Sequence, residues 1–323
     1  MPTRPRHGNG LAQGQSNSLR SHSGHGRAPD SSIMPSIRII DSITAPGSIN
    51  RPNEDSAGGN ATCAFVIDGA TGLGGASLVG LHGSDAAWLA RFARSTFEEL
   101  ARNGRPMADV VRELNQRAAN VVHEAAPALP IEPWNLPVAS FQMVRIEGDE
   151  IVTHGLGDCR LFLLGANGST LSTCAIKGAS AQERDGARAA IAHAGGFATH
   201  QALADAPGVR EELRRHRAGY NRVGGSVWTL GIEPSAAEHL VTETLASSLP
   251  ARGLLCSDGF AALVDQYGRY DAAGFVAAAS TAGLAPLLEE LRHIELTEDP
   301  DGKQFPRFKV SDDATAVLFE IVT

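Results

Sequence analysis

The sequence predicts an α+β fold in which strands and helices are grouped apart. Between residues 138 and 176, short apolar segments are separated by the turn sequences GD, GLGD and ANG, which is typical of neighbouring antiparallel strands. Two stretches with helical spacing of apolar residues come before this run, and another follows near the C-terminus. Such grouping favours packed layers over a doubly wound parallel sheet, in which strands and helices alternate.

The chain before the antiparallel run predicts two strands and then two helices. Apolar segments indicate strands at 37–43 and 63–68. Ser84 is a suitable N-cap for the first helix, and Pro106 is a suitable opening residue for the second. Apolar residues recur on one face of each helix: Trp88, Leu89, Phe92 and Leu100 in the first, and Val110, Val111, Leu114, Ala118 and Val121 in the second.

The remaining chain predicts further strands and helices. Strands are expected at 138–146, 150–155, 160–164, 170–176, 238–244, 254–257 and 314–322, and helices over 272–294. The stretch 179–220 is polar and helical in composition. Its charge run comprises Glu211, Glu212, Arg214, Arg215 and Arg217, and we expect it to form a solvated helix face rather than a binding patch.

Composition excludes several classes of protein. The net charge of -8, from 28 Lys and Arg against 36 Asp and Glu, argues against a nucleic-acid binder. Four cysteines lie far apart in apolar segments, which indicates reduced buried thiols rather than a disulfide framework or a zinc site. No stretch approaches the roughly 20 apolar residues that span a bilayer, so we expect no membrane partner.

The first 35 residues differ from the rest of the chain. They are rich in Ser, Gly, His and Arg and nearly lack apolar residues, so we expect residues 1–35 to form a disordered tail before one domain over 36–323. The apolar core of a secretory signal is missing. We therefore expect a cytoplasmic protein.

The stretch VIDGATGLGG contains the end of a predicted strand followed by glycines, as a nucleotide-binding loop does. A dinucleotide fingerprint placed on Gly72 and Gly74 would need a third small hinge where Ser77 stands, and no acid follows at the right distance. The phosphate-loop pattern of glycines followed by Lys and Ser or Thr is also absent from the sequence. Asp68 is therefore the more informative residue of this stretch.

Other acids stand beside predicted strands. They are Glu54 and Asp55 in RPNEDS, Asp258 in LLCSDGF, and Asp312 and Asp313 in SDDATAVLF. Each alone is typical of a turn. Carboxylates at strand ends can converge on one point, however, and packed anionic oxygens are the ligands that Mg²⁺ and Mn²⁺ prefer.

Five motifs follow one another in the order NEDS, VIDGATG, GLGDCRLFLL, LLCSDGF and SDDATAVL. In this order they resemble the metal-dependent protein phosphatases, the type 2C serine/threonine class, and the chain is similar to a bacterial member from about residue 37 to the C-terminus. The resemblance implies two antiparallel sheets in a sandwich with helices on both sides, a two-metal site at one end, and a variable flap subdomain over 176–231.

The resemblance also implies roles for single residues. Asp68 would be the bridging ligand of two Mn²⁺ or Mg²⁺ ions, and Gly69 would offer its backbone carbonyl. Asp258 and Asp313 would be further direct ligands. The remaining acids of the NEDS and GLGD motifs would complete the shell: Glu54 and Asp55 as holders of metal-bound water or as ligands, and Asp158 as part of a weaker third site.

Three positions depart from the pattern that the resemblance implies. Relatives carry a phosphate-binding Arg where Asn50 stands, and Arg51 is one residue closer; Pro52 could let the shortened loop still aim Arg51 at the phosphate. Ala70 replaces a His that many relatives have, and Ala262 replaces an acid of the third site. Two-metal chemistry is expected to survive these changes better than three-metal chemistry.

The expected function is therefore hydrolysis of phosphoserine or phosphothreonine in a phosphorylated protein substrate by water that two metal ions activate, with Asp55, Asp68 and Arg51 as catalytic residues. Two alternatives stay open. One is a phosphatase fold that has lost turnover and acts as a regulatory or binding module. The other is the same chemistry on a small phosphomonoester. The sequence indicates neither the physiological substrate nor the oligomeric state.

Overall fold

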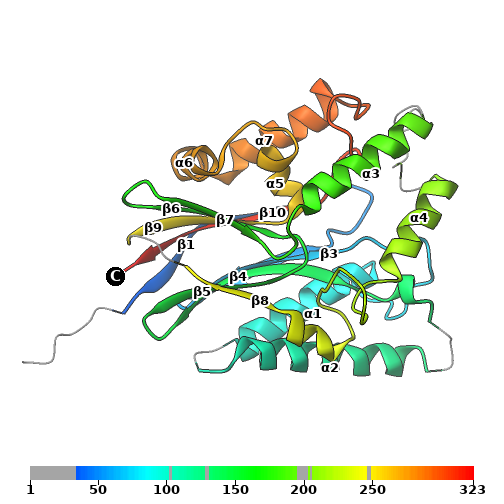
Figure 1. Cartoon of the computed structure of the whole chain (residues 1–323), viewed down its shortest axis with the longest axis horizontal. Coiled ribbons are helices and arrows are strands. Elements are labelled where there is room, and N and C mark those ends of the chain that lie inside the picture. The colour runs from blue at the N-terminus through cyan, green and yellow to red at the C-terminus, as the bar shows by residue number, and fades with distance from the viewer. Residues whose placement is uncertain (1–33, 102–103, 128–130, 195–202, 204–205, 246–248) are drawn as a thin grey trace, which may run out of the picture. The chain divides into compact units, whose positions relative to one another are not determined.

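The computed structural model describes residues 34–323, apart from 102–103, 128–130, 195–202, 204–205 and 246–248. The tail expected at residues 1–35 therefore lies almost wholly outside the described residues. Within 34–323, two five-stranded antiparallel sheets lie face to face with helices on both outer faces (Figure 1). This arrangement confirms the expected α+β fold and the four layers that the resemblance implied.

The first sheet has the strand order β1-β10-β9-β6-β7. Its strands are β1 Ser36–Ala45, β10 Ala314–Val322, β9 Ala251–Cys256, β6 Arg160–Gly165 and β7 Thr170–Cys174. The second sheet has the order β2-β3-β4-β5-β8. Its strands are β2 Asp55–Gly59, β3 Cys63–Gly69, β4 Ala139–Glu147, β5 Glu150–Leu156 and β8 Val241–Thr244.

Helices cover the outer face of each sheet (Figure 1). On the second sheet lie α1 Asp85–Leu100 and α2 Met107–Ala125, and on the first lie α5 Asp258–Asp265, α6 Ala272–Ala282 and α7 Leu284–His293. The insertion between β7 and β8 contains α3 Ala179–Ala194 and α4 Pro207–Arg217. Short helical turns complete the set: η1 Pro133–Asn135, η3 Pro234–His239 and η4 Ile294–Glu298.

Alternation along the strands builds the layers. In β3, Phe65 and Ile67 pack toward α1 and α2, whereas Ala64 and Val66 pack against residues of the first sheet. Because successive side chains of a strand point to opposite faces, Asp68 continues the even-numbered series that points between the sheets. The strand pattern therefore places the acid of the VIDGATG motif at the mouth of the sandwich.

The predicted helix starts are confirmed. Ser84 caps α1, and its side chain accepts a hydrogen bond from the Ala87 amide. Pro106 directly precedes α2, where its missing N–H removes no helical hydrogen bond. The apolar stripes of both helices are buried against the second sheet.

Two elements were not expected from the sequence. β2 has the sequence DSAGG, which has low β-propensity; it forms because β3 supplies hydrogen-bond partners along its whole length. Asp258 does not end a strand: β9 ends at Cys256, and Asp258 is the first residue of α5. The SDG sequence marks a helix start here rather than a turn.

The four cysteines are free, and three of them are buried, which agrees with the expected reduced thiols. Among the described residues, no single helix has the length and apolar character needed to cross a membrane. The pair formed by residues 272–282 and 284–298 passes that test by length and composition, with a bend of 118°.

Candidate metal centre

The acids of the motifs gather at one end of the two sheets. Asp55 begins β2 and Asp68 stands near the end of β3, and the two residues are direct partners in the antiparallel register. Directly opposite residues point to the same face of a sheet, with Cβ atoms roughly 4.5–5.5 Å apart. Two carboxylates therefore face one another at the mouth of the sandwich.

The neighbouring strand β4 extends the row of polar side chains that Asp55 and Asp68 begin. Ser140 of β4 is the partner of Asp68, and its hydroxyl donates a hydrogen bond of 2.6 Å to Asp158 Oδ1. Asp158 follows Gly157, which has a φ of +81° and passes so close to Ser140 that a Cβ would lie 2.0 Å from the hydroxyl oxygen. Glycine at this position lets the GLGD turn bring Asp158 to the row.

The first sheet contributes Asp258, at the start of α5, and Asp312 and Asp313, immediately before β10. A Cβ on Gly259 would lie 2.1 Å from the Asp313 carbonyl oxygen. On Gly69, it would lie 2.6 Å from the Glu54 carbonyl oxygen. The glycine after each acid thus allows a close backbone approach between motifs, which explains why both motifs read DG.

The raised pKa values of these acids indicate that their charged forms need a neutralising cation. Burial and the carboxylates of Asp258 and Asp55 raise the pKa of Asp68 well above its usual range. Burial, Asp158 and Asp312 raise the pKa of Asp258 to about 7. The causes are the same for both groups: loss of hydration and repulsion between like charges.

Asp55 is the clearest case. Its side chain is 5% exposed, and neither carboxylate oxygen has a hydrogen bond of normal geometry, although Ser257 and Thr315 lie close. Burial and the charge of Asp313 raise its pKa well above the usual value. A buried carboxylate without hydrogen bonds is costly, and a bound cation or proton relieves that cost.

Asp312 and Asp313 have different roles. Asp313 accepts the Gly47 amide at 2.8 Å and the Glu54 amide at 2.6 Å, so it holds the loop before β2 in place while lying near Asp55. Asp312 lies near Asp258 and accepts a hydrogen bond from Lys309 at 2.6 Å. Sequence reasoning named Asp313 as a ligand, and the structure adds Asp312 to the centre.

Glu54 is held by hydroxyl groups. Its two carboxylate oxygens accept hydrogen bonds from Ser84 at 2.6 Å and from Thr71 at 2.5 Å. Burial raises its pKa above the usual value. The Gly69 amide donates to the Glu54 carbonyl oxygen at 3.1 Å, which joins the NEDS and VIDGATG motifs through their backbones.

Comparison with known proteins identifies the fold. No family model matches the chain, and no curated protein sequence matches it significantly. Among solved structures, the catalytic domain of the serine/threonine protein phosphatase PstP, in complex with two manganese ions, matches with a TM-score of 0.50 and 18% identity over 90% of this chain and 100% of that one. The chain has the fold of the metal-dependent protein phosphatases.

Two more structures with this fold match less well. The Mycobacterium tuberculosis serine/threonine phosphatase PstP/Ppp has a TM-score of 0.49 and 17% identity over 89% of this chain and 100% of that one. PppA from Pseudomonas aeruginosa has a TM-score of 0.48 and 15% identity over 89% and 98%. Identities of this size concern the fold alone.

In this phosphatase fold the residues present fit divalent ions. The donors are carboxylates, which Mg²⁺ and Mn²⁺ prefer, and the buried oxygens of Asp55 lack partners. Within the described ranges, no three His, Cys, Asp or Glu side chains already stand around one point in a way that could hold a metal ion. The fit therefore rests on the donor chemistry and on the unpaired oxygens of Asp55.

The expected solvated helix face in α4 is wrong for two of its residues. Arg214 donates two hydrogen bonds to the Leu73 carbonyl oxygen, at 3.0 and 2.7 Å, and stacks on Trp134 at 4.1 Å. Arg217 donates to the Ala70 carbonyl oxygen at 3.4 Å, and the acids of the centre that attract it are Glu54 and Asp158. Glu211, Glu212 and Arg215 are exposed as expected, and Arg215 pairs with Glu212 on the surface.

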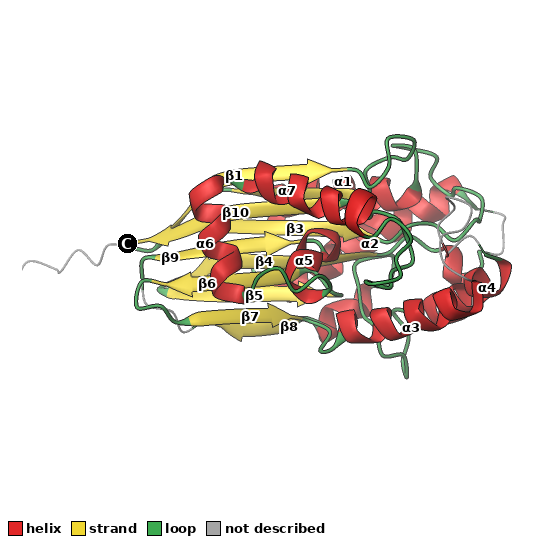
Figure 2. Ribbon diagram, turned by 90° about the horizontal axis from the view of Figure 1, so that it is seen from above, coloured by secondary structure: helices red, strands yellow, loops and turns green. Residues whose placement is uncertain are grey.

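The insertion between β7 and β8 is thereby fastened to the VIDGATGLGG loop. Figures 1 and 2 show α3 and α4 beyond the strand ends, at the end of the sandwich where β3 ends and β10 begins. Arg217 brings a guanidinium to the edge of the acidic centre. Arg51, the phosphate ligand expected from the sequence, lies exposed in the loop between β1 and β2.

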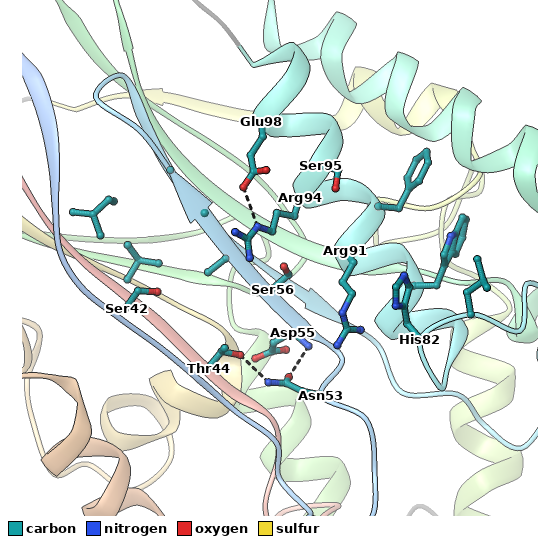
Figure 3. Close-up of a pocket in the computed structure, with 18 residues that line it drawn as sticks. Ser42, Thr44, Asn53, Asp55, Ser56, His82, Arg91, Arg94, Ser95 and Glu98 are labelled. Carbon is teal, nitrogen blue, oxygen red and sulfur yellow. Dashed lines mark hydrogen bonds and ion pairs between the residues drawn. The ribbon is translucent and has the colours of Figure 1, made fainter.

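Two pockets touch the centre. The larger, of about 860 Å³, is lined by residues of β1, β2 and α1 and includes Asp55 in its lining (Figure 3). Its other polar lining includes Arg91 and His82, while Asn53 bonds to Thr44 and to the Asp55 amide. The smaller, of about 60 Å³, is lined by Glu183, Asp258, Lys309 and Asp312. Of the acids of the centre, Asp55 lines the larger pocket, whereas Asp258 and Asp312 line the smaller one.

Proposed function

We propose that the protein is a metal-dependent phosphatase that removes phosphate from phosphoserine or phosphothreonine in proteins. The observation that carries the proposal is the facing pair of Asp55, which is buried, and Asp68, which is half-buried, with further carboxylates beside them. The shared fold with PstP, whose catalytic domain was crystallised with two manganese ions, supports the same class of cofactor.

Mn²⁺ or Mg²⁺ would be held by Asp68 and Asp258, as the sequence indicates, and by Asp312 in place of the expected Asp313, with Asp55 and the Gly69 carbonyl beside them. Bound there, the ions supply Lewis-acid charge to a phosphomonoester and to the water that attacks it. Glu54 and Asp313 support this set, since both fix the loop that carries Asp55. Asp158, fixed by Ser140, is the acid available for a weaker third ion.

The protein's own residues bind and orient the phosphate. The Arg217 guanidinium lies at the rim of the centre, where its planar fork suits two phosphoryl oxygens. Arg51, in the exposed loop before β2, is the phosphate ligand that the sequence indicates. Arg217 lies in the insertion between β7 and β8, so this insertion would contribute to phosphate binding and to the choice of phosphoprotein.

One observation favours the alternative of a binding module without turnover. Both oxygens of Glu54 are taken up by hydroxyl groups, and Lys309 lies among the acids. A centre that is satisfied by its own side chains would recognise a phosphoprotein without hydrolysing it.

Two substrates separate the candidate functions. Hydrolysis of a phosphothreonine peptide and of p-nitrophenyl phosphate is measured after EDTA treatment and again with MgCl₂ or MnCl₂. The proposed function predicts metal-dependent turnover of both substrates, with higher kcat/KM for the peptide. Turnover of p-nitrophenyl phosphate alone would favour a small-molecule phosphatase. No turnover under any condition, together with binding of the peptide, would favour the module.

A further inference from the structure

Lys309 places a positive charge inside the acidic centre. Its ammonium group donates to Asp312 Oδ1 at 2.6 Å and to the Thr71 hydroxyl at 3.0 Å. The Thr71 hydroxyl in turn donates to Glu54 at 2.5 Å. One lysine is thus connected to acids of two different motifs, one just before β2 and one just before β10.

The charges around Lys309 come from several elements. Asp258 of α5 and Asp68 of β3 both attract it, together with Asp312. Glu183 of α3 lines the same small pocket, and Asp158 lies near Asp258. Burial lowers the pKa of Lys309, but these acids outweigh burial and raise it, so the group is a permanent cation at neutral pH.

The backbone around Lys309 is anchored. Phe308 and Val310, its two neighbours, pack against Ala190 of α3 and Leu203. Arg292 donates to the Asp312 carbonyl oxygen at 2.9 Å and fixes the other end of the segment. Packing of its two neighbours and the hydrogen bond from Arg292 therefore fix the backbone position of Lys309 beside the acids.

We infer that Lys309 is a resident cation of the acidic centre, which stabilises the carboxylates of Asp312, Asp258 and Asp68 without metal and competes with divalent ions for them. The inference rests on the proposed function, because it concerns the ions that the proposed phosphatase needs. An ammonium group within a few ångströms of a divalent ion repels it, and removing that group should tighten ion binding.

This role predicts two effects of opposite sign in Lys309→Met. The affinity for Mn²⁺ should rise by roughly tenfold, which corresponds to about 1.4 kcal/mol. The melting temperature of the EDTA-treated protein should fall, because the acids lose their cation. A purely structural lysine would lower both the stability and the affinity. Lys309→Arg keeps the charge and should restore wild-type behaviour in both measurements.

The test uses the full chain. Calorimetric titration with MnCl₂ alone and thermal melting in EDTA are measured for wild type, Lys309→Met, Lys309→Arg and the control Lys303→Met, whose lysine pairs with Asp301 on the surface. Tighter Mn²⁺ binding with a lower melting temperature in Lys309→Met alone would support the inference. Equal affinities in wild type and Lys309→Met would overturn it and leave the proposed function intact. Absence of Mn²⁺ binding in all four proteins would overturn the proposed function itself.

Discussion

Asp55 and Asp68 are direct partners across the β2–β3 ladder, so their carboxyl groups point to the same face at the mouth of the sandwich. Like charges directly opposite one another destabilise a sheet unless a proton or a cation lies between them. Burial adds to this cost and raises the pKa of both groups well above the usual range. The facing pair therefore lowers the stability of the fold without a bound cation or proton, and it favours the binding of a cation.

Removing one charge of the centre should abolish activity without lowering the stability of the metal-free protein. Asp68→Asn is expected to weaken Mn²⁺ binding and abolish phosphate release, because an amide keeps the shape but not the charge that holds the ion. The melting temperature in EDTA should stay level or rise, since repulsion between Asp68 and Asp258 is relieved. Calorimetry and melting curves check both, with Asp301→Asn, an exposed acid, as the control.

The stability of the metal-free protein should depend on pH with a defined sign. The pKa of Asp258 is about 7 in the folded chain and about 3.9 in an unfolded one, so the folded state holds its proton more tightly. The stabilisation is complete below about pH 4 and is lost as the pH rises through about 7. Melting curves in EDTA should therefore fall over this window, and Asp258→Asn should flatten the fall. A metal-free protein that became more stable over the same window would contradict this reading.

The two candidate arginines should differ in their effect on substrate binding. Arg217→Ala is expected to raise KM for a phosphothreonine peptide, at a cost of roughly 1.5–3 kcal/mol in kcat/KM for a lost charged hydrogen bond, with Mn²⁺ affinity close to wild type. Arg51→Ala should have a smaller effect, and Arg215→Ala, on the exposed side of α4, should have none. A large effect of Arg51→Ala with wild-type kinetics in Arg217→Ala would contradict this prediction. Arg51, which the sequence indicates, would then be the phosphate ligand.

The close backbone approach at Gly259 gives a further prediction. In Gly259→Ala the new methyl group would lie 2.1 Å from the Asp313 carbonyl oxygen, so Asp258 and the strand β10 must move apart. We expect a lower melting temperature and weaker Mn²⁺ binding. Gly208→Ala is the matched control, because no atom lies within 4 Å of its added methyl group.

Deleting residues 1–33 should leave the melting temperature and the kinetics unchanged, because that segment nearly lacks apolar residues and can bury little surface. Melting curves and peptide hydrolysis of the shortened chain check this. A clear drop in either would show that the segment docks on the domain.

Much of the fold could be predicted from the sequence because strong local patterns agree with tertiary packing. The bounds of β10 follow from a short apolar run, which is typical of a strand buried on both faces, and the N-cap Ser84 follows from capping chemistry. β2 could not be predicted, since DSAGG has no strand pattern and depends on β3 for its hydrogen bonds.

The site was predictable to the level of motifs but not of single side chains. Asp312 and Asp313 are neighbours in sequence, and only the fold shows that one contacts Lys309 while the other accepts two backbone amides. The role of Arg217 was missed because its partner is a backbone carbonyl 147 positions away, which leaves no signal in a local charge pattern.

The central claim is that the facing acids form the metal centre of a phosphatase. Phosphate release from a phosphothreonine peptide, measured while EDTA-treated protein is titrated with MnCl₂, tests it most directly in wild type and Asp68→Asn. We expect no release without metal, saturable release with Mn²⁺ in wild type, and none in Asp68→Asn at any concentration. Release that persists in EDTA, or that is equal in the two proteins, would contradict it.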